Sequence, residues 1–405
     1  MLQMKEKEKD KNNTVFSMLS WFRAEKVKNA RVMVAGAGAL GNEALKNLAL
    51  FGIGNIVIVD FDIIEHSNLT RSILFRAEDA DNRSLKAEVA AKRVKEINPD
   101  ICTIPVCGNL FTDVGLGVYR RMDVIIGCLD SLMARLLLNR LCYRAGKAWV
   151  DGGIGDLEGM ASVYIPGVSC YECTLTGDEK LDLDKHMSCA DVIKINENAG
   201  RVATTPVSAS IIAAIQVQEA MKIIHEGLVG EDFFKSLANK LFVYEGAIPS
   251  ADIYDFPSYD PGCTAHEYWH PVTEISELSA DTTIPRAIEI IKKNLNVDSV
   301  EINMMNNKFV DKIVSRSGNK CFYPMLPESN IPEYINTVEE LRDLQINEGF
   351  YQNSFENIDN TFPYRNLTLK QIGIPYLDVI KVSTEKRTYY VELSNDIKYY
   401  ERIAG

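Results

Sequence analysis

Three glycines and one acidic residue near the N-terminus have the spacing of a phosphate-binding and ribose-binding unit. Gly36, Gly38 and Gly41 form a G-x-G-x-x-G pattern after the short apolar run 32–35. Residues without a Cβ let the backbone turn tightly and approach a phosphate, which the first amides of a following helix can bind. Asp60 ends the next apolar run about twenty residues later, where a carboxylate accepts hydrogen bonds from ribose hydroxyls. This order predicts a nucleotide-binding strand, helix and strand, with a ligand-free tight turn as the alternative.

Further along the chain, polar side chains could supply the charges that a nucleotide polyanion requires. Asn68, Arg71 and Lys86 offer donors or positive charge to phosphates, and Asp130 offers an oxygen ligand for Mg²⁺. Asp130 follows a buried strand predicted at 123–127. Ligands of open α/β sheets bind beyond the carboxyl ends of the strands, which is where the two acids fall. Taken singly, each charged residue fits a solvated surface position, but their joint order favours a site.

The motifs together resemble the ThiF/MoeB family of ubiquitin-like-protein activating enzymes over residues 31–225. The segments that carry the resemblance are Asp60-Phe61-Asp62, Ser67-Asn68-Leu69-Thr70-Arg71, Lys86-Ala87-Glu88, Asn98-Pro99 and Cys128-Leu129-Asp130. The resemblance implies that the C-terminal glycine carboxylate of a small β-grasp protein attacks the α-phosphate of ATP, giving an acyl-adenylate and pyrophosphate. It further implies that Asp60 binds the ribose, Arg71 and Lys86 the phosphates, and Asp130 the Mg²⁺ and the transition state. The remaining members of the implied nucleotide set are Gly36, Gly38, Gly41, Asp62 and Asn68.

The segment before the first strand departs from the family pattern. Relatives often carry an arginine there that reaches the nucleotide of a partner subunit, whereas Phe16 and Ser17 have no arginine before them. Arg23 is the nearby candidate. The resemblance implies a homodimer, and this departure leaves open how each of its two sites would be completed.

Two short motifs, about ninety residues apart, have the ligand spacing of a zinc site. Cys170 and Cys173 form a C-x-x-C pair, and Cys263 and His266 form a C-x-x-H pair, with His270 as a rival ligand. Two such half-sites make a tetrahedral zinc site without an open position for water, so the metal would be structural. The family that the chain resembles has a structural zinc at matching half-sites, usually held by four cysteines. The alternative is a set of reduced buried cysteines and a surface histidine.

Cys189 is the candidate nucleophile. It lies between the C-x-x-C pair and a helix of small and apolar residues predicted over 204–224. The resemblance implies a thioester-forming cysteine at this place in enzymes that charge a conjugating enzyme. A thiolate suits that role because it is a good nucleophile and a reasonable leaving group, and Lys185 or His186 could lower its pKa. The alternatives are a loop cysteine without a role and a zinc ligand.

Three further charged residues follow Asp130 in the sequence. Arg135 and Arg140 fall on a predicted helix, where charged faces are usually solvated. The run 149–153 is predicted to be a strand and a turn. Its Asp151 either faces the site or makes the hydrogen bonds of an Asp-Gly-Gly turn.

Composition limits the class of protein. A chain of 405 residues with 46% hydrophobic and 25% charged residues is typical of a globular protein of two or three domains. The net charge of −12 disfavours nucleic-acid binding, because phosphates attract basic faces. The apolar runs are shorter than the roughly 20 residues that a bilayer requires, and the N-terminus lacks a secretory core, so we expect a cytoplasmic protein that spans no membrane. Nine scattered cysteines favour reduced thiols and metal ligands over disulfides.

We predict an α/β chain with a Rossmann-like adenylation domain, built on a mixed sheet, and a smaller α+β domain that is β-grasp-like. The predicted parts are a disordered tail (1–13), the adenylation domain (14–250) with its cysteine loop near 176–203, a proline-rich crossover with the second zinc half-site (251–271), and the ubiquitin-fold-like domain (272–405). The last domain is predicted from strand, helix and strand at 273–278, 285–294 and 299–303, and from a closing helix, turn and strand over 367–382.

Three functions fit these features. The first is ATP-dependent activation of a ubiquitin-like protein, capture at Cys189 as a thioester, and transfer to a conjugating enzyme docked on the C-terminal domain. The second stops at the adenylate and supports sulfur transfer, as in the thiamine and molybdopterin branches. The third, a non-catalytic subunit of an activating heterodimer, is disfavoured because Arg71, Lys86 and Asp130 are all present. The chain resembles short bacterial-type enzymes, and that resemblance alone suggests an antiviral conjugation pathway.

Overall fold

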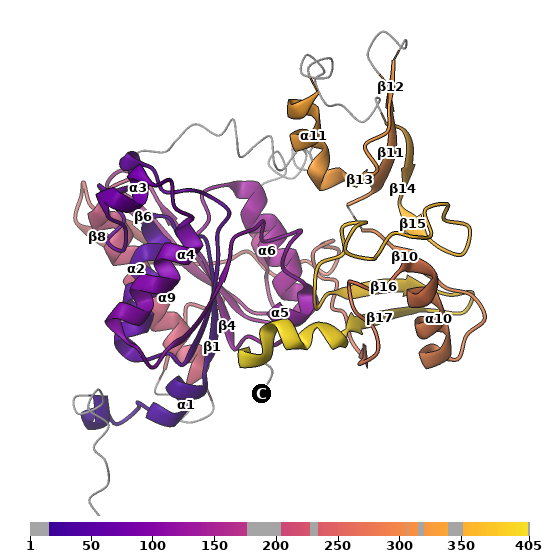
Figure 1. Cartoon of the computed structure of the whole chain (residues 1–405). Helices are drawn as coiled ribbons and strands as arrows, with labels where there is room; N and C mark the ends of the chain where they lie inside the picture. The colour runs from indigo at the N-terminus through magenta and orange to yellow at the C-terminus, as the bar shows by residue number, and fades with distance from the viewer. Residues whose placement is uncertain are drawn as a thin grey trace, which may run out of the picture.

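The computed structural model describes residues 16–175, 204–226, 234–305, 307–314, 320–338 and 351–403 (Figure 1). The predicted N-terminal tail and the loop with Lys185, His186 and Cys189 lie outside the described residues.

One eight-stranded sheet forms the centre of the first domain, in the order β3-β2-β1-β4-β5-β6-β7-β8. The strands from β3 to β5 in that order are parallel, and β6 to β8 continue the sheet in antiparallel pairing. This mixed sheet confirms the predicted α/β class. The strands are β1 (Arg31–Ala35), β2 (Asn55–Val59), β3 (Cys102–Val106), β4 (Val124–Gly127), β5 (Trp149–Ile154), β6 (Glu158–Tyr164), β7 (Lys240–Glu245) and β8 (Ser250–Asp255).

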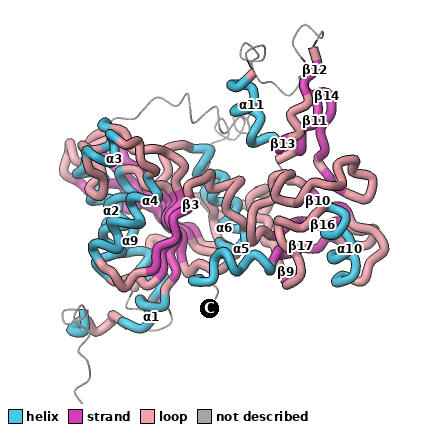
Figure 2. Tube along the Cα trace, in the orientation of Figure 1, coloured by secondary structure: helices cyan, strands magenta, loops and turns pink. Residues whose placement is uncertain are grey.

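Helices cover both faces of this sheet (Figures 1 and 2). On one face, α2 (Ala39–Phe51), α4 (Lys86–Ile97) and α9 (Pro206–Ile224) pack against alternate strand residues such as Val32 and Val34. On the other, α5 (Leu116–Arg120) and α6 (Leu132–Ala145) pack against the intervening residues, such as Met33 and Ala35. A strand covered on both faces must be apolar at nearly every position, which explains why β1, β2 and β4 are continuous apolar runs.

Short elements flank this core. They are η1 (Phe16–Met18), α1 (Ala24–Asn29), η2 (His66–Asn68), α3 (Ala77–Asp81) and η3 (Tyr171–Thr174). The side chain of Arg23, the candidate for an arginine that reaches a partner subunit, donates to the backbone oxygens of Ser20 (2.7 Å) and Phe22 (3.2 Å). In this structure the guanidinium is therefore held against its own turn.

Helix α9 is long and apolar enough, by length and composition, to cross a membrane. However, 56% of its apolar window is buried within the protein. It packs beside α2 on the same face of the sheet, with Ala209, Ile212 and Val217 in the core. These contacts are those of a central core helix.

The C-terminal domain contains a five-stranded sheet in the order β15-β10-β16-β17-β9 and a second, smaller sheet in which β11 pairs with β12, β13 and β14. The strands are β9 (Val272–Ile275), β10 (Glu301–Asn303), β11 (Phe309–Val314), β12 (Cys321–Phe322), β13 (Leu326–Pro327), β14 (Tyr351–Phe355), β15 (Asn357–Ile358), β16 (Val379–Ser383) and β17 (Thr388–Leu393). The helical elements are α10 (Ile284–Leu295), η4 (Glu328–Asn330), α11 (Ile331–Thr337) and η7 (Ser394–Ile403).

This domain opens with the predicted strand, helix and strand, which are β9, α10 and β10. The predicted helix in the closing segment is wrong, because residues 366–377 form turns that lead into β16. Its apolar residues, such as Leu369 and Ile372, are buried by packing onto the sheet and not by helical periodicity. Assignment to the ubiquitin fold stays a prediction.

The two domains share a core and a set of buried polar contacts. Leu377 and Val379 join the hydrophobic cluster on the α5 and α6 face of the large sheet. The fully buried Glu392 on β17 accepts two hydrogen bonds from Arg121 (2.8 and 3.0 Å) and pairs with Arg120. These contacts fix the C-terminal domain against the domain of the eight-stranded sheet.

Candidate functional site

The glycine loop turns at the carboxyl end of β1 and leads into α2. Gly36 has a φ of +95°, and a Cβ there would lie 2.5 Å from the carbonyl oxygen of Cys128. A Cβ on Gly41 would lie 2.0 Å from the carbonyl oxygen of Gly36, whereas one on Gly38 would meet no atom of the described residues within 4 Å. The outer glycines are therefore required for the loop conformation. Gly38 borders open space at the N-terminus of α2, where backbone amides can bind a phosphate.

Asn42, which the sequence analysis does not single out, ties this loop to the segment after β2. Its fully buried side chain donates to the carbonyl oxygens of Ala37 (2.7 Å) and Gly38 (3.0 Å). Its amide oxygen accepts a hydrogen bond from the Leu74 backbone at 2.9 Å. A polar residue on the buried side of an amphipathic helix is the one signal that could have identified it.

Asp60 lies at the carboxyl end of β2, beside the glycine loop. Its carboxylate oxygens accept hydrogen bonds from the backbone amides of Ala37 (2.7 Å) and Asp62 (2.8 Å). Burial raises the pKa of Asp60, and the nearby charge of Lys86 opposes that rise. Because each carboxylate oxygen has two lone pairs, Asp60 can hold the loop and still accept a bond from a ribose hydroxyl.

Lys86, the first residue of α4, points its ammonium at Asp62. The distance from Lys86 Nζ to Asp62 Oδ2 is 2.6 Å. Lys86 is only 9% exposed, whereas half of the Asp62 side chain is exposed. The pair holds a lysine beside the loop, where a phosphate would compete with Asp62 for its charge.

Asn68 and Arg71 lie on the turn that follows β2. The Asn68 side-chain oxygen accepts a hydrogen bond from the Glu65 backbone at 2.9 Å, and Arg71 Nη1 donates to the Ser67 carbonyl at 2.9 Å. A guanidinium has five N–H donors, so this bond leaves Arg71 with capacity for a phosphate.

Asp130 is exposed in the turn between β4 and α6. The amide of Cys128 donates to the Ala35 carbonyl at 2.8 Å, and Ser131 caps α6 by accepting from the Ala134 amide at 3.1 Å. Since β1 lies between β2 and β4, the acids at the ends of β2 and β4 flank the glycine loop where the strand order reverses. That reversal is where α/β sheets bind ligands, and an exposed carboxylate suits Mg²⁺, which takes one or two carboxylates together with phosphate oxygens.

The expected solvation of the α6 arginines is wrong. The Arg135 side chain is 15% exposed, and its Nε lies 3.4 Å from Asp151 Oδ1. Arg140 forms two hydrogen bonds with Glu172, at 2.6 and 2.8 Å. Asp151 lies inside β5 and not in a turn, and it is 3% exposed. Both arginines are covered by segments distant in sequence, which periodicity within the helix does not reveal.

The two predicted metal half-sites come together. The ligand atoms of Cys170, Cys173, Cys263 and His266 all lie within 4.8 Å of one another. Cys170 Sγ is 3.8 Å from Cys173 Sγ and from Cys263 Sγ, and Cys173 Sγ is 3.4 Å from His266 Nε2. Tetrahedral zinc with Zn–S of about 2.3 Å and Zn–N of about 2.0 Å requires S···S of about 3.8 Å and S···N of about 3.5 Å. The donor set is therefore compatible with zinc.

The cluster contains His266 and not its rival His270. The His266 ring stacks on Tyr143, with centroids 4.8 Å apart, and on Tyr259, with centroids 4.5 Å apart. His270 instead stacks on Tyr268 at 5.4 Å. The tyrosines hold the imidazole in orientation, and the C-x-x-H motif carries no signal for either of them.

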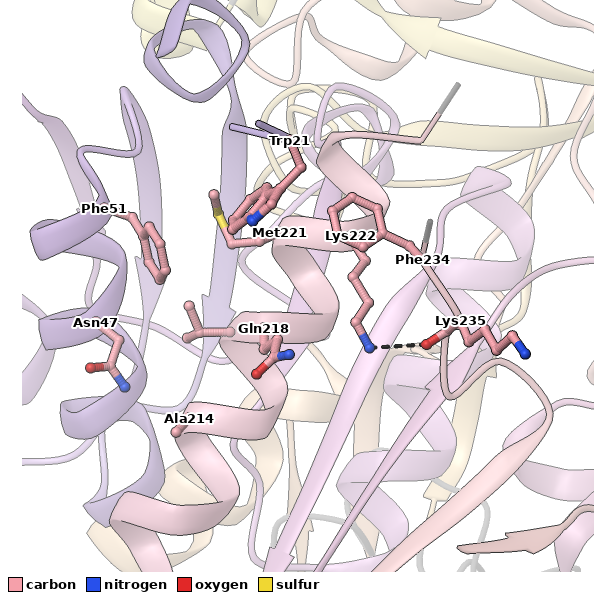
Figure 3. A pocket seen from close by; sticks show the side chains of 10 residues that line it. Trp21, Asn47, Phe51, Ala214, Gln218, Met221, Lys222, Phe234 and Lys235 are labelled. Carbon is pink, nitrogen blue, oxygen red and sulfur yellow. Dashed lines mark hydrogen bonds between the residues drawn. The ribbon is translucent and has the colours of Figure 1, made fainter. Parts of the chain in front are cut away.

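Figure 3 shows a cavity of about 620 Å³, whose lining includes no residue of either site. It is lined by Trp21, Asn47, Phe51, Ala214, Val217, Gln218, Met221, Lys222, Phe234 and Lys235. These residues come mainly from α2 and α9, and none of them is a glycine or acid of the strand ends. The cavity is no part of the nucleotide site.

A doubly wound sheet with a glycine loop and strand-end acids at its point of reversal defines a nucleotide-binding α/β protein. The Cys/His cluster adds a candidate metal site to this class of protein. A family model also matches the chain. The model of the ThiF family matches residues 12–264, and the chain belongs to that family.

Several activating enzymes are similar to this chain. The SAMP-activating enzyme E1 of Haloferax volcanii is 33% identical over 196 residues, which are 48% of this chain and 67% of that protein. The NEDD8-activating enzyme E1 catalytic subunit of Arabidopsis thaliana is 40% identical over 159 residues, which are 36% of this chain and 34% of that protein. The chain thus spans two thirds of the first relative but about a third of the second.

Solved structures show a partial likeness. The structure of E. coli MccB with ATP has a TM-score of 0.48 and 23% identity, and the match covers 60% of this chain and 68% of that chain.

Proposed function

We propose that this protein uses ATP to adenylate the C-terminal carboxylate of a ubiquitin-like protein and then transfers the activated protein, through a thioester, to a conjugating enzyme. One observation carries the proposal: the glycine loop, Asp60, Lys86 and the turn with Asp130 converge at the reversal of strand order. Membership of the ThiF family and similarity to activating enzymes support it.

In the adenylation step, a carboxylate oxygen of the substrate attacks the α-phosphorus of ATP. The bond from that phosphorus to the bridging oxygen breaks, and pyrophosphate leaves with the electron pair. Negative charge develops on the phosphate oxygens, where Lys86 and Arg71 would donate hydrogen bonds and positive charge. Asp60 would hold the ribose. Mg²⁺, held by Asp130 and the phosphates, would supply further charge neutralisation when bound.

In the proposed second step, the Cys189 thiolate attacks the carbonyl carbon of the acyl-adenylate and AMP leaves. Cys189 lies outside the described residues. In the sequence, this cysteine lies between the C-x-x-C half-site and α9. That order, together with the family resemblance, supports the step. The sulfur-transfer alternative shares the first step and lacks this thioester.

A charging assay tests both steps. The purified chain would be mixed with ATP, Mg²⁺ and each β-grasp protein encoded beside its gene, and exchange of labelled pyrophosphate into ATP would be measured. Exchange that depends on one β-grasp protein is expected, and exchange with none of them would contradict the proposal. A thiol-labile adduct that disappears in Cys189→Ala would establish the thioester, whereas exchange without an adduct would favour sulfur transfer.

The proposal extends to the metal and to the oligomer. We propose that the Cys/His cluster holds one structural zinc, because its four donors match a closed tetrahedral site. We also propose a homodimer, as the family resemblance implies. Metal analysis of the purified protein should give about one zinc per chain, and light scattering should give twice the monomer mass.

A further inference from the structure

The side chain of Arg135 connects the carboxyl ends of two neighbouring strands. Its Nη2 donates to the Leu129 carbonyl at 3.0 Å and to the Gly152 carbonyl at 3.2 Å. Leu129 immediately precedes Asp130 in the turn after β4, and Gly152 lies in β5. The hydrogen bonds therefore hold the turn of the acid against the adjacent strand.

The surroundings of Arg135 are shaped to receive a guanidinium. Asp151, which is buried on β5, lies 3.4 Å from Arg135 Nε and compensates the charge. Glycine two positions later leaves room for the guanidinium, since a Cβ on Gly153 would lie 3.0 Å from Arg135 Nη2, closer than an ordinary contact. A planar group with several donors can bond two carbonyls and face a carboxylate at once, and an ammonium has no such fixed geometry. The Asp-Gly-Gly sequence thus provides a counter-charge and space for one arginine.

The same turn also touches the glycine loop. The Cys128 amide donates to Ala35, and the Cys128 carbonyl fills the space beside Gly36 where a Cβ would be. On the opposite side, the buried amide of Gln216 donates to the Gly127 carbonyl at 2.7 Å. Residues 127–129 are therefore fixed on three sides, and Asp130 is the first exposed residue that follows them.

We propose that Arg135 is a positioning residue that sets the location of Asp130 relative to the glycine loop, and thereby the binding of the metal–nucleotide complex. The inference rests on the proposed function, since it takes Asp130 as the carboxylate that binds Mg²⁺. Arg135 is not taken as a phosphate ligand itself, because its Nη2 donates to two backbone carbonyls and its Nε faces the buried Asp151.

Equilibrium binding of ATP to the full chain, measured by calorimetry with and without Mg²⁺, tests this role. The ratio of the ATP affinity with Mg²⁺ to the ATP affinity without it, called the metal ratio below, reports how much the metal contributes to binding. In Arg135→Lys we expect this ratio to fall by about tenfold, in line with the loss seen when outer-shell partners of a metal site are removed, while metal-free ATP binding is retained. Asp130→Asn should lower the same ratio by at least as much.

The matched control is Arg121→Lys. Arg121, like Arg135, faces a buried carboxylate: it forms two hydrogen bonds with Glu392, and its side chain is 18% exposed against 15% for Arg135. It lies at the domain junction, away from the strand ends. The control should lose thermal stability without a change in the metal ratio.

An unchanged ratio in Arg135→Lys, with a melting temperature lowered as in Arg121→Lys, would show a purely structural role and overturn the inference. The readout is independent of the protein substrate. A wild-type chain that binds ATP with a clear Mg²⁺ effect but supports no pyrophosphate exchange would contradict the proposed function and leave this inference standing. A wild-type chain without a Mg²⁺ effect on ATP binding would overturn the inference.

Discussion

At the nucleotide site, the candidate side chains lie at strand ends with donors or lone pairs in reserve, whereas the four donors of the Cys/His cluster face one another. Asp130 is exposed, and Asp62, the partner of Lys86, is half exposed. By contrast, Cys170 and Cys173 are buried, and His266 is packed against two tyrosine rings. The first arrangement leaves hydrogen-bonding capacity for a ligand, and the second has the closed geometry of a structural metal site.

The contrast extends to what each region connects. The nucleotide site draws its residues from the ends of neighbouring strands, the turns after them and the start of α4. The cluster joins η3 to the crossover before β9, beside Tyr143 on α6. The residue after His266, Glu267, pairs with Arg144 on α6 (3.2 Å) and with Lys381 on β16 (2.9 Å). A closed metal there would stabilise the junction of the domains. Removal of the metal should therefore lower the stability of the protein more than it affects the chemistry at the strand ends.

The largest effect is expected from Lys86→Met. Loss of one preorganised donor to developing charge lowers a rate by about 10²–10³-fold, so pyrophosphate exchange should fall by that factor. The melting temperature should change little, because Asp62, the carboxylate left behind, is half exposed.

Lys46→Met is the matched control for that substitution. Lys46 also pairs with a carboxylate, the buried Glu43, but the pair lies within α2 and not at a strand end. Equal losses of exchange in the two variants would contradict the role of Lys86.

Cys173→Ser should act in the opposite way, on stability more than on chemistry. Loss of a ligand from a closed tetrahedral site opens it and weakens the metal. We expect less than one zinc per chain and a melting temperature lowered by roughly 10 °C, which corresponds to about 3–4 kcal/mol in a domain of this size. Scanning calorimetry and metal analysis would measure both.

Cys321→Ser serves as its control, since Cys321 is an exposed free thiol outside the cluster. A Cys173→Ser protein that keeps its zinc and its melting temperature would refute the closed cluster.

A pair of glycine substitutions separates loop conformation from ligand space. Gly36→Ala places a Cβ 2.5 Å from a carbonyl oxygen at a φ of +95°, so it should destabilise the fold by about 2 kcal/mol or more. Gly38→Ala meets no atom, so its melting temperature should stay within about 2 °C of wild type. Its ATP affinity should nevertheless fall, because the added methyl group occupies the space of the phosphate. Unchanged ATP binding in Gly38→Ala would mean that the phosphate lies elsewhere.

The smallest effect is expected from His266→Cys, which replaces one zinc ligand by another. A four-cysteine site has the same tetrahedral closure, so the variant should retain about one zinc and melt within a few degrees of wild type. His270→Ala should also keep its zinc. A variant at His270 that loses the metal while His266→Ala retains it would reverse the assignment of the fourth ligand.

Much of the nucleotide site follows from local sequence. The glycines, Asp60 and Asp130 were identified because each lies within a few residues of a strand end, and strand ends in a parallel sheet meet at one edge. The roles of Asn42, Arg135 and Gln216 were not, because each depends on hydrogen bonds to backbone atoms far along the chain, and no spacing encodes them.

The metal cluster, too, is determined partly by local sequence and partly by tertiary packing. Each half-site is a four-residue motif, so its two ligands are brought together by a single turn, and the sequence alone determined them. The packing of η3, the crossover and α6 brings the two half-sites together, selects His266 over His270 and places two tyrosine rings against His266. Likewise, apolar runs determined the α/β class, while tertiary structure decided the strand order of the C-terminal domain and replaced its predicted closing helix with turns. The reason is physical: short-range geometry is set by neighbouring residues, whereas burial and long-range hydrogen bonds exist only once distant segments have packed together.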